Sequence, residues 1–390
     1  MKEDKITVAL LWSRYSGNVT SVNDLVLGFD KERFNVIFIY ISGYGVEKNL
    51  LKEAGYKVFY LSNIQRINTF RFSILFRLVR ILKEHNVDIL HCHRHKSMVY
   101  GTIAAVLAKT PVVLSHVHGL DRTRNMGRRL LNFFLFKRVN RIIGCARSVR
   151  DDVLKNNPFV CPEKVIAFEN SVDFDCFANV SITKVEAKSK LVGVPVDAFV
   201  YGTVARFGQY KGHSFLIKAF ERVRKQVPSA HLILAGDGPL KEEIQQQAAK
   251  ASLDDSVHFL GRRDDIPKLL RAMDAFVLPS IGSEGMPLVI LEAMAAGIPC
   301  IASSLSGIPE VINNSDVGLL VPPKDENALA EAMITLANAP EQKLKGIIER
   351  AKERIRSNFN HDVVMKKLEN TYEMEINHYY ESNRRQKSNV

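Results

Sequence analysis

Two glutamates lie within a mainly apolar stretch in the second half of the chain. Residues 283–299 read SEGMPLVILEAMAAGIP, with Glu284 near the start and Glu292 among leucine, alanine and methionine. Pro287 suits a first helical turn and Gly297 suits a helix end, so Glu284 should precede a helix that contains Glu292. Both carboxylates could simply be exposed. An unpaired buried carboxylate is costly, however, which favours a partner rich in hydroxyl groups, such as a sugar.

Two cations follow a predicted strand in the same half. In GTVARFGQYKGH (202–213), Arg206 follows the strand and Lys211 lies just before a predicted helix. Guanidinium, ammonium and the free N–H groups of a helix start all attract anions, so this segment could bind a diphosphate. The Gly-Asp-Gly turn of LAGDGPLKEEI (234–244) is only weak evidence for a phosphate site, because a tight strand-to-helix turn needs glycine in any case.

Several histidines cluster in the first half: His91, His93, His95, His116 and His118. Alternate residues of a strand share one face, so His91 and His93 could contribute to a zinc site. Ordinary hydrogen-bonded histidines are the alternative.

Short runs rich in branched apolar residues predict strands along the whole chain. In the first half they cover residues 6–12, 35–41, 58–61, 88–93, 112–117, 141–146 and 165–169. In the second half they cover residues 199–204, 231–236, 257–261, 275–279, 300–303 and 318–321. Amphipathic stretches separate them, and this α/β alternation is typical of parallel sheets covered by helices, here twice over.

The alternation stops between Phe177 and Val196, where we place the join between two domains. We expect a first Rossmann-like domain at residues 1–180 and a second at residues 196–364, with a C-terminal helix at about 365–385 packed back on the first. Two doubly wound sheets would face one another across a cleft, and ligands of such sheets bind at the carboxyl ends of the strands.

Charge is concentrated in the first half. Of the net charge of +12, residues 1–190 carry +13 and residues 191–390 carry −1. Two segments there mix basic with bulky apolar residues, namely FRFSILFRLVRILK (70–83) and GRRLLNFFLFKRVNR (127–141). They could be solvated helix faces, or they could bind an anionic membrane surface or an anionic acceptor. No helix-turn-helix, zinc-finger or RNP-type pattern accompanies the charge, which argues against nucleic acid as the partner.

Cysteine spacing and hydropathy indicate a cytoplasmic protein. The five cysteines contain no C-x-x-C pair, so neither a disulfide framework nor a cysteine-rich zinc site is expected. The start MKEDKITVALLW is too acidic for a secretory signal, and no window of 18 apolar residues is free of charge.

Taken together, the motifs resemble those of retaining glycosyltransferases of the GT-B fold, family 4 (glycosyl transferases group 1). Glu284 and Glu292 form an E-x7-E motif, and Arg206 with Lys211 forms an Arg-x4-Lys motif. The resemblance covers nearly the whole chain, through DILHCHRHKS, VVLSHVHGL, KVIAFENSVDFDCF, SGIPEVI and GLLVPPKDENALAEAM.

The resemblance implies which residues bind the donor nucleotide-sugar. Arg206 and Lys211 would neutralise its diphosphate as it leaves, and Glu292 would bind the ribose hydroxyls. Backbone groups would hold sugar hydroxyls and phosphate oxygens at Gly285, Met286, Pro287 and Leu288. Gly17, in the loop after the first strand, would let the backbone approach the donor phosphate.

The resemblance also implies a catalytic set of Glu284, His118, Arg206 and Lys211. Glu284 would lie near the transferred sugar, and His118 of the H-G pair would reach that sugar and the acceptor. The acceptor hydroxyl would attack on the face that the nucleotide leaves, so the protein's task is to stabilise leaving-group charge, and a lost contact typically costs roughly 10²–10³ in rate. Cations and a helix dipole would replace a divalent ion, so neither a metal nor a resident cofactor is expected.

The sequence departs from the family pattern in three places. The first loop, WSRYSGNVTS, lacks paired glycines around Gly17, and Ser171 follows Asn170 where glycine is usual. Ser306 replaces the first of two glycines before Ile308. We interpret the two serines as tolerated turn substitutions.

The expected function is a cytoplasmic hexosyltransferase-type enzyme, peripheral on the inner face of the cell membrane. Its acceptor would be a carbohydrate, lipid-linked or in lipopolysaccharide or surface polysaccharide biosynthesis. A soluble-acceptor enzyme of sucrose, trehalose or glucan type is one alternative, and a GT-B sugar-nucleotide epimerase, which needs no acceptor, is another. A non-enzymatic sugar-binding module fits less well, because the full diphosphate set is present.

Overall fold

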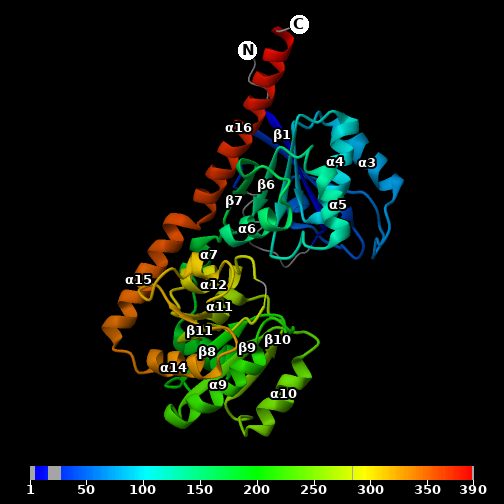
Figure 1. Cartoon of the computed structure of the whole chain (residues 1–390). Coiled ribbons are helices and arrows are strands. Elements are labelled where there is room, and N and C mark those ends of the chain that lie inside the picture. The colour runs from blue at the N-terminus through cyan, green and yellow to red at the C-terminus, as the bar shows by residue number, and fades with distance from the viewer. Residues whose placement is uncertain (1–4, 16–27, 283, 389–390) are drawn as a thin grey trace. The chain divides into compact units, whose positions relative to one another are not determined.

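Thirteen parallel strands build two separate sheets in the computed structural model, which describes residues 5–15, 28–282 and 284–388 (Figure 1). The chain divides into two compact units. The first unit comprises residues 1–169 and 361–390, and the second comprises residues 170–360. The chain thus leaves the first unit once and returns to it at its C-terminal end.

The sheet of the first unit has seven strands in the order β3-β2-β1-β4-β5-β6-β7. They are β1 (Ile6–Arg14), β2 (Phe34–Ser42), β3 (Lys57–Tyr60), β4 (Ile89–His93), β5 (Val112–Val117), β6 (Arg141–Gly144) and β7 (Val165–Ala167). All are parallel, with Ala9 opposite Ile37 on one side and opposite Leu90 on the other. Strands covered on both faces read as continuous apolar runs, which is why the branched apolar segments of the sequence became these strands.

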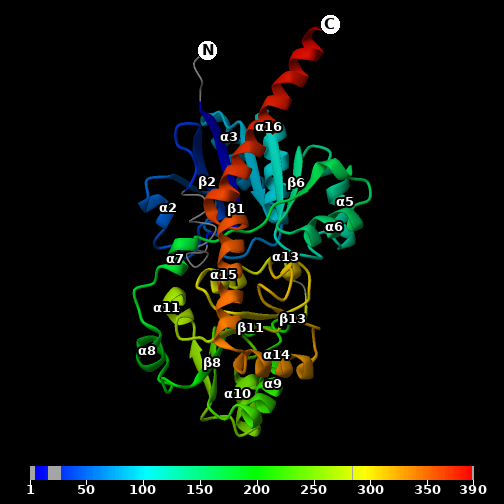
Figure 2. The same ribbon diagram turned by 90° about the vertical axis from the view of Figure 1, so that its left-hand side faces the viewer.

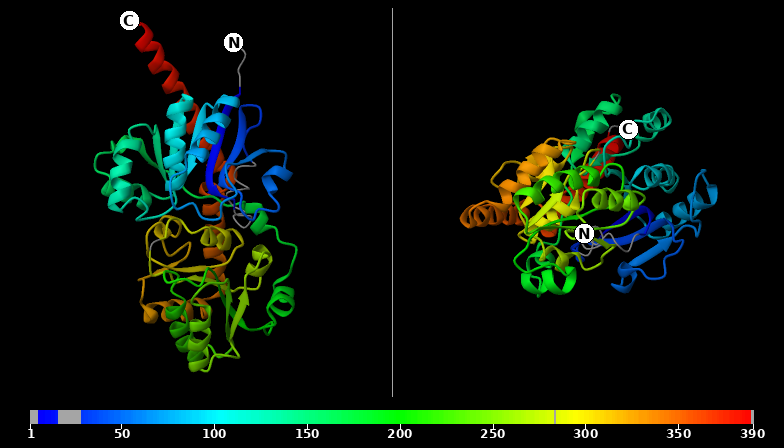
Figure 3. Two further views of the ribbon diagram at one scale, coloured as in Figure 1. Left: turned by 90° about the vertical axis from the view of Figure 1, so that its right-hand side faces the viewer. Right: turned by 90° about the horizontal axis from the view of Figure 1, so that it is seen from below.

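Helices cover both faces of this sheet: α2 (Leu50–Glu53), α3 (Phe72–Glu84), α4 (His95–Ala108), α5 (Met126–Leu135), α6 (Arg147–Asn156) and α16 (His361–Ser388). Figures 1 and 2 show α16 running along one face, and Figure 3 shows α3 and α4 on the opposite face. On α16, the ring of Tyr372 is fully buried and stacks on Phe29. Glu369 accepts a hydrogen bond from the N–H of Asp30 at 2.8 Å. The C-terminal helix is therefore part of the first core.

The sheet of the second unit has six parallel strands in the order β10-β9-β8-β11-β12-β13. They are β8 (Phe199–Val204), β9 (Ala230–Ala235), β10 (Val257–Gly261), β11 (Ala275–Leu278), β12 (Cys300–Ser303) and β13 (Leu319–Val321). The helices are α7 (Phe174–Ala178), α8 (Lys184–Glu186), α9 (His213–Gln226), α10 (Lys241–Lys250), α11 (Ile266–Leu270), α12 (Leu288–Ala295), α13 (Ile308–Val311), α14 (Glu326–Ala337) and α15 (Glu341–Asn358). The fully buried ring of Phe220 on α9 anchors the apolar core between this sheet and its helices.

The segment that we expected to join the two domains, between Phe177 and Val196, belongs instead to the second unit. It forms α7, α8 and a π-helical turn, Ala187–Val192. Lys188 lies 2.9 Å from the Asp274 carboxylate and also donates to the Ala198 carbonyl at 2.7 Å. These long-range contacts order a stretch whose local sequence resembles a loop, and the division falls at residues 169 and 170.

Candidate active site

The strand order of the second sheet reverses between β8 and β11, and the predicted donor-site residues follow these two strands. Arg206 comes two residues after β8, and Glu284 lies in the loop between β11 and α12. In doubly wound sheets, ligands bind outside the carboxyl ends of the strands at the point of reversal. The fold therefore brings these residues to the part of the second unit where a ligand is expected.

Lys211 and Glu284 form an ion pair at this position. The Lys211 ammonium lies 2.6 Å from Oε1 of Glu284, and the Ser280 hydroxyl donates to the same oxygen at 2.6 Å. The Glu284 side chain is only 11% exposed, so these two partners, rather than water, stabilise its negative charge. The sequence interpretation gives Lys211 a diphosphate and Glu284 a sugar as separate ligands. Because the two side chains form an ion pair, a bound ligand would contact both of them together.

Glycines allow the two loops of this site to approach closely. Gly212 adopts φ +71°, and a Cβ there would collide with the Pro279 carbonyl. The N–H of Ile281 donates to the Tyr210 carbonyl at 2.8 Å. Because a side chain at 212 would meet both strain and a clash, glycine is needed to keep Lys211 beside Glu284.

Glu292 lies on α12, partly buried, and its carboxylate has no hydrogen bond or ion pair to another described residue. Burial alone raises its pKa to about 7. An acceptor held without a protein partner is suited to hydroxyl donors of a ligand. The structure thus provides the partly buried, unpaired carboxylate that the sequence suggested.

The start of α12 is held by the chain on both sides. Pro287 is the N-cap residue, one position before the first helical residue Leu288, and no side chain caps the helix. The side-chain amide of Asn170 donates to the Met286 carbonyl at 2.7 Å, and the N–H of Gly307 donates to the Gly285 carbonyl at 3.1 Å. These carbonyl contacts leave the first N–H groups of the helix free to face a ligand.

The two serine substitutions behave differently in the structure. Ser306 adopts φ +56°, the left-handed region that favours glycine. Ser171 is not among the described residues with positive φ, so its position does not require glycine. Gly17 lies outside the described residues.

Arg206 is exposed and forms no ion pair with any described residue. Its neighbour Phe207 is fully buried and stacks on His213 at 4.2 Å, and burial lowers the pKa of His213 to about 4. This buried pair anchors the loop, while the guanidinium of Arg206 stays available for an anion.

In the first unit, four of the five clustered histidines stack along the ends of β4 and β5. His116 lies between His91 and His118, with ring centroids 5.4 and 4.2 Å away, and Trp12 stacks on His93 at 3.8 Å. His93 Nδ1 lies 3.1 Å from His118 Nε2, and His91 Nδ1 lies 2.7 Å from the Tyr372 hydroxyl.

Burial lowers the pKa of all four stacked histidines, that of His116 to about 3. The stacked imidazoles are therefore neutral at pH 7.

Nitrogens of His91, His93 and His116 lie within 4.8 Å of one another, close enough to be considered as a metal site. The rings of His91 and His116 are stacked within 2° of parallel. A metal ion lies near the plane of each imidazole that binds it, and two parallel stacked rings share no such point. This geometry argues against a metal ion shared by His91 and His116, although neither ring nitrogen of His116 has a hydrogen-bond partner among the described residues. His95 stands apart and pairs with Asn132 at 3.1 Å.

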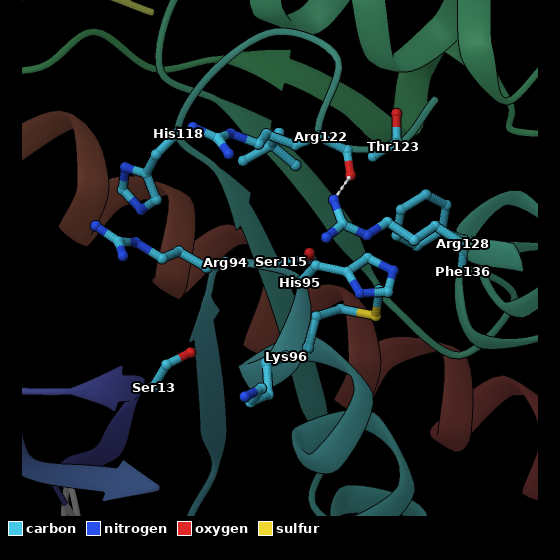
Figure 4. Close-up of a pocket in the computed structure, with 12 residues that line it drawn as sticks. Ser13, Arg94, His95, Lys96, Ser115, His118, Arg122, Thr123, Arg128 and Phe136 are labelled. Atoms are coloured by element: carbon cyan, nitrogen blue, oxygen red, sulfur yellow. Dashed lines mark hydrogen bonds between the residues drawn. The ribbon is translucent and has the colours of Figure 1, made fainter. Parts of the chain in front are cut away.

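A pocket of about 330 Å³ opens beside His118, within the first unit (Figure 4). It lies where the strand order reverses between β1 and β4. Its walls come from the end of β1, the start of α4, the end of β5 and the segment 122–136. The structure thus places His118 at a ligand-binding position of its own sheet.

Several residues of these sites were missed by the sequence interpretation: Trp12, Arg94, Asn170, Ser280 and Tyr372. Trp12 and Tyr372 reach the histidine stack from β1 and α16, so only the tertiary fold reveals them. Arg94 carried a possible signal, because it directly follows the predicted strand that contains His93.

Two family profiles match this chain. Residues 198–339 match the family described as Glycosyl transferases group 1, and residues 15–175 match Glycosyltransferase Family 4. Together they cover most of both units.

Individual proteins are similar as well. The UDP-Gal:alpha-D-GlcNAc-diphosphoundecaprenol alpha-1,3-galactosyltransferase of Escherichia coli is 32% identical over 273 residues, 68% of this chain and 70% of that protein. A putative glycosyltransferase of Bacillus subtilis, EpsF, is 31% identical over 296 residues, 74% of this chain and 76% of that protein. The crystal structure of Anabaena HepE with UDP and glucose superposes with a TM-score of 0.81 at 22% identity, over 94% of this chain and 99% of that chain.

The family profiles span both units, and the superposition extends over nearly the whole chain. The chain is therefore a glycosyltransferase with the GT-B fold, and it belongs to glycosyltransferase family 4.

Proposed function

We propose that this glycosyltransferase transfers a hexose, with retention of configuration, from a nucleotide-sugar donor to a carbohydrate acceptor. The observation that carries the proposal is the unpaired, partly buried carboxylate of Glu292, whose pKa burial raises to about 7, beside the uncapped start of α12. Ribose hydroxyls would supply the hydrogen bonds that the protein does not. The N–H groups at the start of α12 would hold phosphate oxygens.

Leaving-group charge would be stabilised by two cations of the same site. Arg206 has no anionic partner in the described chain, and Lys211 shares its charge with Glu284 at 2.6 Å. A diphosphate that approaches Lys211 gains an ammonium already positioned by Glu284, so little reorganisation accompanies bond cleavage. These cations would act in place of a divalent ion, and we propose catalysis without a metal or a resident cofactor.

His118 would serve the acceptor side of the reaction. Burial, together with nearby His116 and Arg94, lowers its pKa well below the usual value. A neutral imidazole can accept or donate a hydrogen bond, depending on its tautomer. It could therefore orient hydroxyls of the transferred sugar and of the acceptor without adding charge.

We propose an acceptor that is lipid-linked, in lipopolysaccharide or surface polysaccharide biosynthesis. The similar Escherichia coli enzyme is named for a sugar attached to diphosphoundecaprenol. Both basic segments form helices that leave large apolar side chains exposed: Phe72 (67%) and Phe76 (63%) on α3, and Leu130 (67%) and Phe134 (60%) on α5. Exposed aromatics beside basic residues suit the headgroup layer of a membrane.

No helix of the described chain is long and apolar enough to cross a bilayer. We propose peripheral association with the cytoplasmic face of the cell membrane, through α3 and α5.

A donor screen tests the proposed reaction. The full chain is incubated with UDP-, GDP- and ADP-sugars, and release of the nucleotide is followed with and without acceptor. We expect nucleotide release that depends on acceptor, and a product with the anomeric configuration of the donor by NMR. Inversion would refute the retaining mechanism. Free sugar and nucleotide formed without acceptor would indicate the epimerase alternative, and activity confined to soluble sugars would indicate an enzyme of sucrose, trehalose or glucan type.

A further inference from the structure

The pocket beside His118 is lined by four cationic side chains. They are Arg94, Lys96, Arg122 and Arg128. Among the residues that the structure describes, no aspartate or glutamate lines it. Clustered positive charge in a concave site concentrates anions, and this cluster lies in the unit that does not carry the Arg206 and Lys211 site.

Two of these guanidinium groups have no partner in the described part of the chain. Arg94 and Arg122 form no side-chain hydrogen bond or ion pair with another described residue. Arg128 donates to the Arg122 carbonyl at 2.8 Å, which holds the loop rather than neutralising charge. The nearby Asp121 carboxylate is paired with Arg124 at 3.6 Å. The pocket therefore keeps an uncompensated positive charge.

The start of α4 adds to the positive potential of the pocket. Arg94 is the N-cap residue of this 14-residue helix, and no side chain caps it. Arg94 also adopts φ +72°, an unfavourable conformation for a residue with a side chain. Such strain persists where the surroundings impose it, and it is common at binding sites. Free N–H groups at the start of α4 and the four cations thus share one cavity.

Figure 4 shows how the cations are arranged. Arg94 and Arg122 extend on the His118 side of the pocket, and Arg128 and His95 lie on the other side. Both Arg94 and Arg122 contribute to the lowered pKa of His118, which is consistent with this proximity. An anion between the two guanidinium groups would therefore lie next to the imidazole that we assign to the acceptor.

Helix α5 connects the pocket with an apolar surface. It provides Arg128 to the pocket, and on its exposed side it presents Met126, Leu130 and Phe134. A ligand with a phosphate group attached to an apolar chain would match both features. A neutral sugar would match neither.

We propose that this pocket is a subsite for the phosphate or diphosphate group of the acceptor, with Arg94 and Arg122 as its principal anion-binding residues. The inference rests on the proposed sugar transfer for its ligand, but it assigns a second anion site in the first unit. Charge-assisted bidentate contacts from arginine are the strong form of phosphate recognition.

Calorimetry of the full chain tests the subsite without relying on turnover. The donor site is first saturated with UDP, and inorganic diphosphate is then titrated. We expect one saturable site in the wild type, at least tenfold weaker in Arg94→Gln/Arg122→Gln. The matched control is Arg129→Gln/Arg138→Gln, which removes the same charge from the same unit outside the pocket and should bind within twofold of the wild type. UDP affinity should be equal in all three proteins.

The proposal is overturned if the UDP-saturated wild type does not bind diphosphate, or if the pocket variant and the control lose affinity equally. A kinetic comparison separates this failure from failure of the proposed function. N-acetylglucosaminyl diphosphate with a short alkyl chain is compared with the neutral alkyl glycoside of the same sugar. The wild type should show a lower KM for the diphosphate, and the pocket variant should lose this preference.

Sugar transfer to both acceptors with equal KM would refute the subsite and leave the transferase function standing. Pocket-dependent diphosphate binding without transfer to either acceptor would support the subsite and contradict the acceptor class proposed above. A third arm uses N-acetylglucosamine 1-phosphate. Whether it competes as well as the alkyl diphosphate distinguishes a soluble phosphosugar from a lipid-linked acceptor, and competition by either one supports the anion subsite.

Discussion

Donor binding should depend on pH through Glu292. Burial raises the pKa of this carboxyl from 4.5 to about 7, and the ionised form is the better acceptor for two ribose hydroxyls. Binding should therefore draw the pKa of Glu292 below 6. With a pKa of about 7 in the free enzyme, about a tenth of the carboxyl is ionised at pH 6 and about nine tenths at pH 8. The nucleotide-sugar donor should bind about tenfold more tightly at pH 8 than at pH 6.

Titration calorimetry provides the assay, with a UDP-sugar because its diphosphate diester does not titrate in this range. At pH 7 binding should release about half a proton, seen as a dependence of the heat on buffer ionisation enthalpy. Glu292→Gln should bind more weakly at pH 8 and show no pH dependence. The exposed Glu243 on α10 gives a matched control, because Glu243→Gln should retain the tenfold change. His213, whose pKa is lowered to about 4, stays neutral throughout.

The same group should affect stability with a defined sign. A carboxyl whose pKa is higher in the folded than in the unfolded state favours folding when it is protonated. Its contribution is therefore fully present below pH 4.5 and is lost as the pH rises through 7. At about 1.4 kcal/mol per pH unit, the loss amounts to about 3 kcal/mol.

Equal UDP-sugar affinity at pH 6 and pH 8 in the wild type, or the same pH dependence in Glu292→Gln, would refute the ribose assignment.

Four further outcomes are expected from other parts of the chain. Arg206→Ala and Lys211→Ala should each lower kcat at least about 100-fold in the nucleotide-release assay, because each removes charge stabilisation of the leaving group. Both variants should retain a cooperative thermal transition. Unchanged kcat and donor affinity in both would contradict the diphosphate assignment. Tyr372→Phe removes the hydrogen bond to His91 and should destabilise the first unit by about 1 kcal/mol, seen as a lower Tm at unchanged UDP affinity; an unchanged Tm would show that this bond contributes nothing. EDTA treatment should leave turnover unchanged. Activity that is lost with EDTA and restored by added metal would contradict this and would make the histidine cluster a candidate metal site again. Sedimentation with anionic vesicles should be strong at low salt, weaker at high salt and absent with neutral vesicles; no binding to anionic vesicles would mean that α3 and α5 are only core-facing helices with solvated basic faces.

Strand positions were predictable from the sequence because both sheets are parallel and covered by helices. All thirteen predicted runs became strands, and residues 112–117, 199–204, 257–261 and 300–303 match without any shift at either end. Such strands are buried on both faces, so apolar runs mark them directly. The segment 177–196 was misjudged because its sequence shows no strand or helix alternation, whereas the fold orders it through long-range contacts such as that of buried Lys188 with Asp274.

The site was predictable where one short motif supplies the residue and unpredictable where the fold supplies the partner. The unpaired carboxylate of Glu292 followed from its apolar neighbours. The pairing of Lys211 with Glu284 did not, because 73 residues separate them and only the adjacency of β8 and β11 brings them together. The hydrogen bond between His91 and Tyr372 spans 281 residues, and no local pattern signals it.

The position of α16 in the first unit has a consequence for how the protein is made. Val364, Met365, Leu368, Tyr372 and Ile376 belong to the same apolar core as strands β1, β2 and β4. A ribosome delivers the second unit as one uninterrupted stretch, so that unit can fold while the chain is still growing. The N-terminal sheet, although synthesised first, must wait with one apolar face uncovered until residue 376 has emerged. During translation the first unit is therefore the one that depends on protection from aggregation, and the stack of His91, His93, His116 and His118 gains its hydrogen bond to Tyr372 only at that point.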